Sequence, residues 1–282
     1  MKIIGIVMGG YSAEYEVSIG SGNVVYNNIK DSGYEVYRLE LTATAWEAID
    51  EDEKRFPIQK DDFSFSRDNR KITFDAIFNA IHGHPGEDGP LAGYFDMLNI
   101  AYTSSGQFAS ALTFNKAECN ILLGHYGFKV PKSIFLHFEE RSPESIIESL
   151  GLPCFVKPCR SGSSIGVSKV KTAEELAPAI AKAKEIDHKV LVESMVSGLE
   201  LACGVSDHEG KAKALAVTHI EPSNDFFDYE AKYSGGSKEI TPAAIPQATY
   251  DLVMESSEKV YALLELKGLA RIDYILDDEG AP

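Results

Sequence analysis

The prediction of the fold rests on Lys157-Pro158-Cys159-Arg160-Ser161-Gly162-Ser163-Ser164-Ile165-Gly166-Val167-Ser168-Lys169. The apolar run from Leu152 to Val156 predicts a strand that enters this stretch, and β-branched residues at Ile165, Val167 and Val170 predict a strand that leaves it. The loop between them holds two glycines and four serines, which bring many backbone N–H groups and hydroxyls together. Such a loop, with a lysine beside it, can wrap a polyphosphate. An ordinary glycine-serine hairpin has the same composition, so other parts of the chain have to decide.

Composition and charge limit the classes of protein to which the chain can belong. Its 282 residues can form two or three domains, and 44% hydrophobic with 25% charged residues is ordinary for a globular protein. The net charge of −16 argues against nucleic acid or an anionic membrane as a partner, because both would repel the chain. No stretch is long enough to span a bilayer, and Met1–Met8 followed by Gly9-Gly10 is typical of a first strand, so we expect a cytoplasmic protein.

The cysteines point to no metal or redox site. They are Cys119, Cys154, Cys159 and Cys203, and they form neither a CxxC pair nor a zinc-binding spacing. We therefore expect four reduced and mostly buried thiols.

The N-terminal part of the chain predicts a βαβ unit, in which ligands bind beyond the carboxyl ends of the strands. The expected elements are a strand over Ile3–Met8, a helix from near Glu14 to about Lys30, strands over Glu35–Leu41 and Thr73–Ile81, and a helix over Pro90–Leu98. The segment from Trp46 to Arg70 is polar and poorly patterned, and no function can be assigned to it.

The rest of the chain alternates predicted helices and strands around the glycine-serine loop. The elements expected before the loop are a helix containing Lys116, a strand near Ser133–His137 and a helix from Ser142 to Gly151. After the loop we expect a helix opened by a capping box at Thr172–Glu175, and strands over Val190–Glu193, Glu200–Val205 and Ala212–His219. The last expected elements are a polar loop over Glu221–Lys238, a helix over Gln247–Leu266, a strand over Leu269–Leu276 and a hairpin turn at Asp277–Gly280.

Four separated motifs resemble one family, the D-alanine–D-alanine ligases of the ATP-grasp superfamily. They are Gly9–Ser18 (GGYSAEYEVS), His82–Gly89 (HGHPGEDG), the Lys157–Lys169 loop, and Asp228–Tyr233 (DYEAKY) with Ala270–Asp273 (ARID). Each motif alone is weak, but all occur in the family's order along the whole chain. The resemblance implies an α/β, three-part ATP-grasp fold with an N-terminal βαβ (Rossmann-like) parallel-sheet domain. The expected domains are residues 1–104, which face the substrate, 105–193, and 194–282.

The resemblance also implies which residues bind the cofactors ATP and Mg²⁺ (or Mn²⁺). Lys116 and Lys157 match the phosphate lysines, Ser163 and Ser164 belong to the phosphate loop, and Lys232 matches a lid lysine over the γ-phosphate. Glu193 and Glu200 match the positions for the adenine amino group and the ribose hydroxyls. Asp273 is the expected metal ligand, and Arg271 is expected to stabilise the developing oxyanion. Without the resemblance, a strand-end lysine, an exposed glutamate or an Arg-x-Asp pair is more often structural.

The expected substrates are two D-alanine molecules, joined to D-alanyl-D-alanine for peptidoglycan synthesis. Glu14 matches the residue that holds the first substrate's ammonium, and His82 is expected near its carboxylate. Ser163 and Tyr233 are expected to form a hydrogen-bonded set with Glu14. The remaining histidines show no metal spacing. A homodimer is expected, although the sequence itself does not give the oligomeric state.

Several alternatives stay open at this level. The chain stops at Pro282, before a second hairpin strand that carries a Glu-x-Asn metal motif in the family, and so we expect a truncated or defective enzyme. A ligase that uses D-lactate or D-serine second is the nearest alternative. A nucleotide-binding protein without ligase activity is another, supported by the missing motif. An oxidoreductase is disfavoured, because Gly9-Gly10 lacks the three-glycine spacing of a dinucleotide site.

Overall fold

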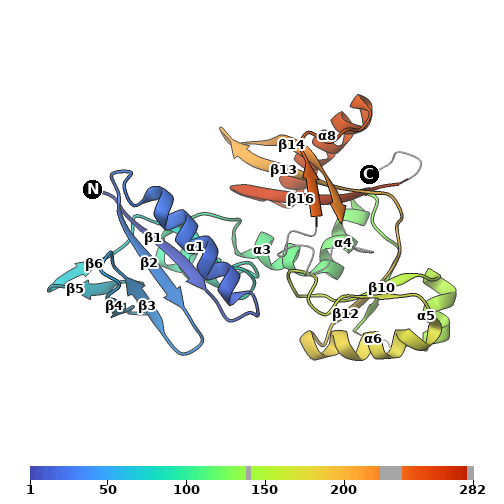
Figure 1. Ribbon diagram of the computed structural model, residues 1–282, viewed down its shortest axis with the longest axis horizontal. Coiled ribbons are helices and arrows are strands. Elements are labelled where there is room, and N and C mark those ends of the chain that lie inside the picture. Colours follow the sequence, from blue (N-terminus) through green and yellow to red (C-terminus); the bar gives the residue numbers. More distant parts are fainter. Residues whose placement is uncertain (138–140, 223–236, 278–282) are drawn as a thin grey trace. The chain divides into compact units, whose positions relative to one another are not determined.

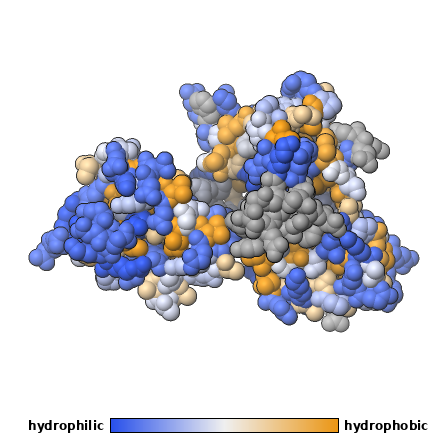
Figure 2. Space-filling view, viewed as in Figure 1, coloured by the Kyte–Doolittle hydropathy of each residue, from blue (hydrophilic) through white to orange (hydrophobic). Residues whose placement is uncertain are grey.

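A computed structural model describes residues 1–137, 141–222 and 237–277 of the chain (Figure 1). The chain forms two compact units, Met1–Ala111 and Leu112–Pro282, and each is described by itself. In Figure 2, hydrophilic residues cover much of the visible face of the first unit, in keeping with the 43 acidic residues of the chain.

The first unit is built on a six-stranded sheet with the order β4-β3-β2-β1-β7-β8. Strand β1 (Ile3–Gly9) lies at its centre, parallel to both β2 (Glu35–Leu41) and β7 (Ala76–Asn79), and α1 (Tyr15–Ile29) connects β1 to β2. The predicted βαβ unit is therefore confirmed. Nearly all residues of β1 are buried, as expected for a central parallel strand with both faces covered.

The segment for which the sequence gives no pattern extends this sheet. Strand β3 (Trp46–Ile49) pairs antiparallel with β2, β4 (Arg55–Pro57) pairs antiparallel with β3, and β5 (Phe65–Arg67) pairs with β6 (Arg70–Ile72) as a separate hairpin. The aromatic side chains around them close one core cluster, in which Trp46 packs against Phe63 with ring centroids 5.9 Å apart. The unit ends with α2 (Pro90–Leu98), β8 (Ala101–Tyr102) and the start of α3 (Gln107–Phe114).

The second unit contains two four-stranded antiparallel sheets. The first has the order β11-β10-β12-β9, formed by β9 (Ser133–Leu136), β10 (Cys154–Pro158), β11 (Ser168–Val170) and β12 (Val190–Ser194). Helices α5 (Pro143–Leu150) and α6 (Ala173–Ile186) cover one face of this sheet and complete its core (Figure 1). The predicted capping box of Thr172 and Glu175 opens α6.

The second sheet has the order β15-β14-β13-β16 and its own core. It consists of β13 (Leu199–His208), β14 (Lys211–Pro222), β15 (Ser237–Ile240) and β16 (Leu269–Leu276), with α8 (Gln247–Leu263) packed on β14 and β13. Helix α4 (Lys116–His125) precedes both sheets in the chain. The polar loop predicted over Glu221–Lys238 lies largely outside the described residues, as does the turn predicted at Asp277–Gly280.

The remaining expectations are met in part. All four cysteines are free, and Cys154, Cys159 and Cys203 are buried. Among the described residues, no helix is both long and apolar enough to cross a membrane. The division into domains 1–104, 105–193 and 194–282 stays a prediction, although the two sheets of the second unit have separate cores.

Candidate functional site

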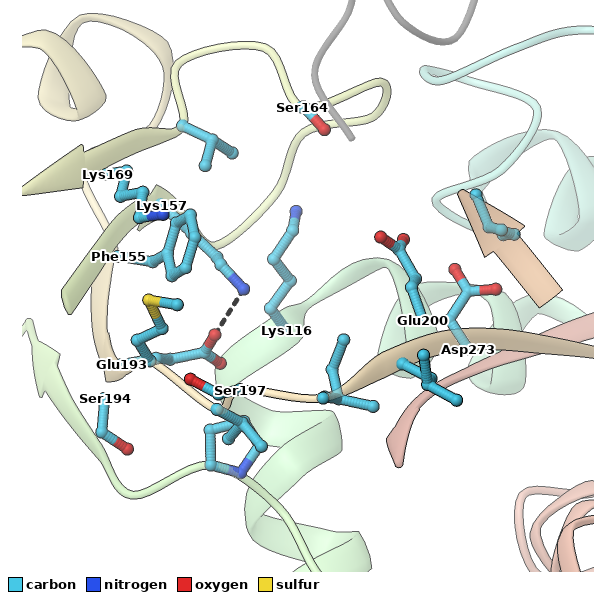
Figure 3. A pocket seen from close by; sticks show the side chains of 18 of the residues that line it. Lys116, Phe155, Lys157, Ser164, Lys169, Glu193, Ser194, Ser197, Glu200 and Asp273 are labelled. Carbon is cyan, nitrogen blue, oxygen red and sulfur yellow. Dashed lines mark hydrogen bonds and ion pairs between the residues drawn. The ribbon is translucent and has the colours of Figure 1, made fainter. Parts of the chain in front are cut away.

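A cavity of about 880 Å³ lies within the second unit, a volume typical of small-ligand sites. Its walls come from β10, β12, β13 and β16, together with the glycine-serine loop and the first residue of α4. The predicted site residues that line it are Lys116, Lys157, Ser163, Ser164, Glu193, Glu200 and Asp273. Residues far apart in the sequence thus meet at one cavity, as the predicted nucleotide site requires (Figure 3).

An ion pair joins two of the predicted residues inside the cavity. Lys157 Nζ contacts Glu193 Oε2 (Figure 3). The side-chain amide of Asn120 donates to Glu193 Oε1 at 2.9 Å. Glu193 is only 4% exposed, so its charge is balanced by these donors rather than by bulk water. Each carboxylate oxygen has a second lone pair, and Glu193 can accept a further donor from a ligand.

Lys116 links α4 to the glycine-serine loop. Its Nζ donates to the carbonyl oxygen of Ser161 at 2.6 Å, and its backbone N–H donates to Cys159 O at 3.0 Å. Asn120 follows one turn later on the same helix, which places both side chains on one face. The sequence analysis missed Asn120, and the i, i+4 spacing from Lys116 is the signal that points to it.

The loop turns tightly at its tip. The N–H of Ile165 donates to Gly162 O at 3.0 Å, and between them Ser163 and Ser164 have positive φ values of 49° and 59°. Two successive left-handed residues form a turn that glycine or asparagine usually occupies, and serine there costs conformational energy. Such strain is found where side chains or backbone groups must be held for a ligand.

A buried carboxylate anchors the base of the loop, and the sequence analysis missed it. Asp187 accepts from the Arg160 backbone N–H at 3.0 Å, from Arg160 Nε at 3.0 Å and from Nη2 at 2.9 Å. Burial acts to raise the pKa of Asp187, but the hydrogen bonds from Arg160 and from the Lys189 backbone outweigh it and hold the pKa below its ordinary value. The start of the loop is therefore fixed to the residues that precede β12.

On the facing sheet, Arg271 and Asp273 pair along β16. Arg271 Nε donates to Asp273 Oδ1 at 2.8 Å, and Nη2 donates to Oδ2 at 3.1 Å. Burial acts to lower the pKa of Arg271, but Asp273 outweighs it and raises the pKa above its ordinary value. Glu200 on β13 faces the same side of the sheet, since Ala202 is its neighbour two residues on and lies opposite Asp273.

The first unit brings Glu14 and His82 together at the carboxyl ends of β1 and β7. Ser12 Oγ donates to the carbonyl oxygen of His82 at 2.8 Å and accepts from the Glu14 backbone N–H at 3.2 Å. Glu14 is 4% exposed, and the His82 ring contacts Ser21 Oγ through Nε2 at 2.9 Å. Both predicted substrate residues are therefore held at the edge of the sheet where βαβ proteins bind ligands.

Comparison with known proteins decides the family. Residues 3–105 match the family described as "D-ala D-ala ligase N-terminus" and residues 122–282 match "D-ala D-ala ligase C-terminus". A protein named D-alanine–D-alanine ligase from Flavobacterium johnsoniae is 44% identical over 279 residues, which are 99% of this chain and 86% of the relative. The chain belongs to the D-alanine–D-alanine ligase family.

Solved structures of the ligase family share the fold. D-alanyl-alanine synthetase A from Vibrio cholerae superposes with a TM-score of 0.85 at 28% identity, and the match covers 99% of this chain and 86% of that one. The VanG D-Ala:D-Ser ligase from Enterococcus faecalis gives 0.83 at 29% identity, with 99% and 88% covered. A Bacillus anthracis D-alanine–D-alanine ligase complexed with ATP gives 0.75 at 26% identity, with 99% and 83% covered. The predicted ATP-grasp fold is therefore confirmed.

Not every residue predicted from the ligase motifs can be placed. Lys232 and Tyr233 lie outside the described residues. Glu14 belongs to the first unit and Ser163 to the second, so their hydrogen-bonded set with Tyr233 stays a prediction.

A magnesium ion fits the ligase cavity only together with a ligand. Within residues 1–137, 141–222 and 237–277, no three His, Cys, Asp or Glu side chains are close enough to hold a metal ion on their own. Mg²⁺ is commonly bound by one or two carboxylates plus substrate phosphates and water. Asp273 at the cavity wall supplies such a carboxylate.

Proposed function

We propose that the chain is an ATP-dependent ligase that joins two D-alanines into D-alanyl-D-alanine, the dipeptide used in peptidoglycan synthesis, with ADP and phosphate as the other products. One observation carries this proposal. In a member of the ligase family, two lysines, a glycine-serine loop and the Asp273 carboxylate line a single cavity of nucleotide size.

The reaction requires two displacements. The carboxylate of the first D-alanine attacks the γ-phosphorus of ATP, the bond to ADP breaks, and an acyl phosphate forms. The amine of the second D-alanine then attacks the acyl carbon and loses a proton, and the tetrahedral intermediate expels phosphate. Catalysis of this kind depends mainly on positioning and on neutralising charge.

The cavity residues divide these tasks. Lys116 and Lys157 neutralise phosphate charge, while the loop with Ser163 and Ser164 provides hydrogen-bond donors. Glu193, with Asn120 beside it, receives the adenine amino group, and Glu200 receives the ribose hydroxyls. Arg271 stabilises the oxyanion of the tetrahedral intermediate. Lys232 is assigned to the γ-phosphate and Tyr233 to the set with Ser163 and Glu14. When bound at Asp273, Mg²⁺ or Mn²⁺ supplies further charge neutralisation at the phosphates.

The substrate choice favours D-alanine in both positions. The relatives at 40–44% identity are named D-alanine–D-alanine ligases, whereas the D-Ala:D-Ser ligase VanG is 29% identical. Glu14 holds the first ammonium and His82 its carboxylate. We place the protein in the cytoplasm as a homodimer. The net charge of −16 supports the absence of nucleic-acid and membrane partners.

The test separates nucleotide binding from ligation. ATP with Mg²⁺ should raise the unfolding temperature, whereas NAD should not, because only ATP fits the phosphate site. D-alanine should then stimulate phosphate release, and mass spectrometry should identify D-alanyl-D-alanine when D-serine and D-lactate compete. Protection by ATP without any D-alanine-dependent phosphate release would reject the ligase in favour of a nucleotide-binding protein. Light scattering checks the dimer.

A further inference from the structure

Three serines, Ser12, Ser18 and Ser21, form hydrogen bonds near the carboxyl ends of β1 and β7 in the first unit. Ser18 is completely buried, accepts from the Gly9 N–H at 2.8 Å and donates to Ala80 O at 2.8 Å. Ser12 joins the backbones of Glu14 and His82. Both therefore act on backbone groups and shape the loops.

Ser21 differs from the other two because its partner is a side chain. It lies on α1 three residues after Ser18, on the same helix face, and its Oγ is 2.9 Å from His82 Nε2. The His82 carbonyl is already held by Ser12. Among the described residues, no hydrogen bond or ion pair involves the other ring nitrogen, Nδ1, which leaves it for a ligand.

A hydroxyl partner at Nε2 determines what Nδ1 can do. In the neutral ring, one nitrogen carries a proton and the other accepts, while a hydroxyl can donate or accept. When Ser21 donates to Nε2, the ring proton must reside on Nδ1. When the ring is protonated on both nitrogens, the hydroxyl turns and accepts from Nε2–H. Nδ1 is therefore an N–H donor in both of these arrangements, whereas a neutral ring protonated on Nε2 would donate to Ser21 and present a lone pair at Nδ1.

The surrounding charges make such a donor necessary for a carboxylate ligand. Glu14 and Glu87 are among the carboxylates of this region: Glu87 interacts electrostatically with the His82 ring, with Glu14 and with Asp88, and Glu87 Oε2 also accepts from the Gly83 N–H at 2.7 Å. An Nδ1 lone pair would add to the repulsion that these two carboxylates exert on an incoming anion.

We propose that Ser21 is a positioning residue that keeps Nδ1–H of His82 available to the carboxylate of the first D-alanine, independently of the ring's charge. This assignment rests on the proposed ligase function, and it adds a residue that does not touch the substrate itself.

The decisive variant is Ser21→Ala, and its effect should depend on pH. Near pH 8.5 the neutral ring is free to carry its proton on Nε2, so D-alanine should bind several-fold to about tenfold more weakly than to the unmodified protein. At a pH low enough that the ring is charged, both nitrogens carry protons, and the difference in D-alanine affinity between the variant and the unmodified protein should nearly vanish. Calorimetric titration of D-alanine, with a non-hydrolysable ATP analogue present, measures the D-alanine affinity of the variant relative to that of the unmodified protein at each pH.

Matched controls separate positioning from loss of structure. Ser21→Thr keeps the hydroxyl and should restore binding at both pH values. Ser18→Ala should lower the unfolding temperature without changing the pH dependence. D-alaninamide, which lacks the carboxylate, should bind the Ser21→Ala variant and the unmodified protein equally well.

The tautomer can also be observed in the unmodified protein, even where Ser21→Ala does not fold. Nitrogen-15 NMR near pH 8.5, assigned through the His82→Gln variant, should show the proton of His82 on Nδ1. A proton on Nε2 overturns the proposal, as does an equal loss of D-alanine affinity at both pH values in Ser21→Ala. If the unmodified protein neither binds D-alanine nor releases phosphate with it, the proposed function itself fails.

Discussion

The two glycine-containing segments of the chain, residues 82–89 in the first unit and 160–168 in the second, have different physical roles. In the first, glycine is required by packing. A Cβ on Gly86 would lie 2.5 Å from Ile81 Cβ, and one on Gly89 would lie 2.5 Å from the backbone oxygen of Gln107. In the second, the left-handed tip is made by Ser163 and Ser164 rather than by glycine.

The difference shows what each segment contributes to the site. The glycines of the first segment let it pack closely against Ile81 and Gln107. This packing fixes the position of the His82 backbone. The second is fixed at its base by Arg160 and Asp187, and keeps hydroxyl side chains at a tip where glycine would be less strained. Variants of the first segment should therefore mainly change stability, whereas loss of a cation beside the second should mainly change nucleotide chemistry.

The largest effect is expected from Lys157→Ala, which removes a cation from the phosphate site. Loss of one charge-stabilising donor costs on the order of 10²–10³ in kcat. Steady-state phosphate release, measured at a temperature where the variant is folded, should show this loss. The unfolding temperature should also fall, because buried Glu193 loses its cationic partner. Lys182→Ala, at an exposed position of α6, is the matched control. A Lys157 variant with unchanged kcat and a raised KM would instead assign uniform binding of ATP to this lysine.

Gly89→Ala should produce the opposite result, a loss of stability that urea unfolding can measure. Gly89 has a φ of 99° and a Cβ there meets a backbone oxygen that cannot rotate away, so about 3 kcal/mol should be lost. Gly33→Ala is matched, because its φ of 85° is similarly left-handed but a Cβ meets nothing within 4 Å. Strain alone should cost Gly33→Ala about 1 kcal/mol. Equal losses in the two variants would refute the packing argument.

Asp187→Asn should have the smallest effect and tests the anchor of the second segment. Removing the charge that faces Arg160 should lower the unfolding free energy by about 1–2 kcal/mol near neutral pH. Because the folded pKa of Asp187 is depressed, its contribution is complete above the ordinary value of about 3.9 and is lost as pH falls through the folded pKa. The difference in unfolding free energy between the variant and the unmodified protein should therefore become smaller below about pH 4. Asp251→Asn, an exposed change on α8, should show no such gap at any pH.

Strong local patterns made much of the fold predictable. The predicted bounds of β2, α2 and β16 agree with the structure, because interspersed apolar residues mark the strands and a proline marks the start of α2. Strands β4, β5 and β6 were missed, since each has only three residues and acquires its burial from the sheet and the aromatic core.

The site was predictable where a motif carries the function and not where a distant partner does. Lys116, Lys157 and Glu193 were predicted from the resemblance to the family, and all line one cavity. Asn120 contacts Glu193 across 73 positions of sequence and Ser21 contacts His82 across 61, so no local pattern reveals either contact. Such residues become visible only when the fold brings the partners together.

The location of the only tryptophan has an optical consequence. Trp46 lies on β3 in the first unit, where its indole N–H donates to the hydroxyl of Tyr11 at 2.7 Å and its ring packs on Tyr94 at 5.6 Å. Its fluorescence therefore reports on the first unit alone, whereas circular dichroism sums over both. Recording the two signals through one denaturation distinguishes units that melt together from units that melt separately, without any label.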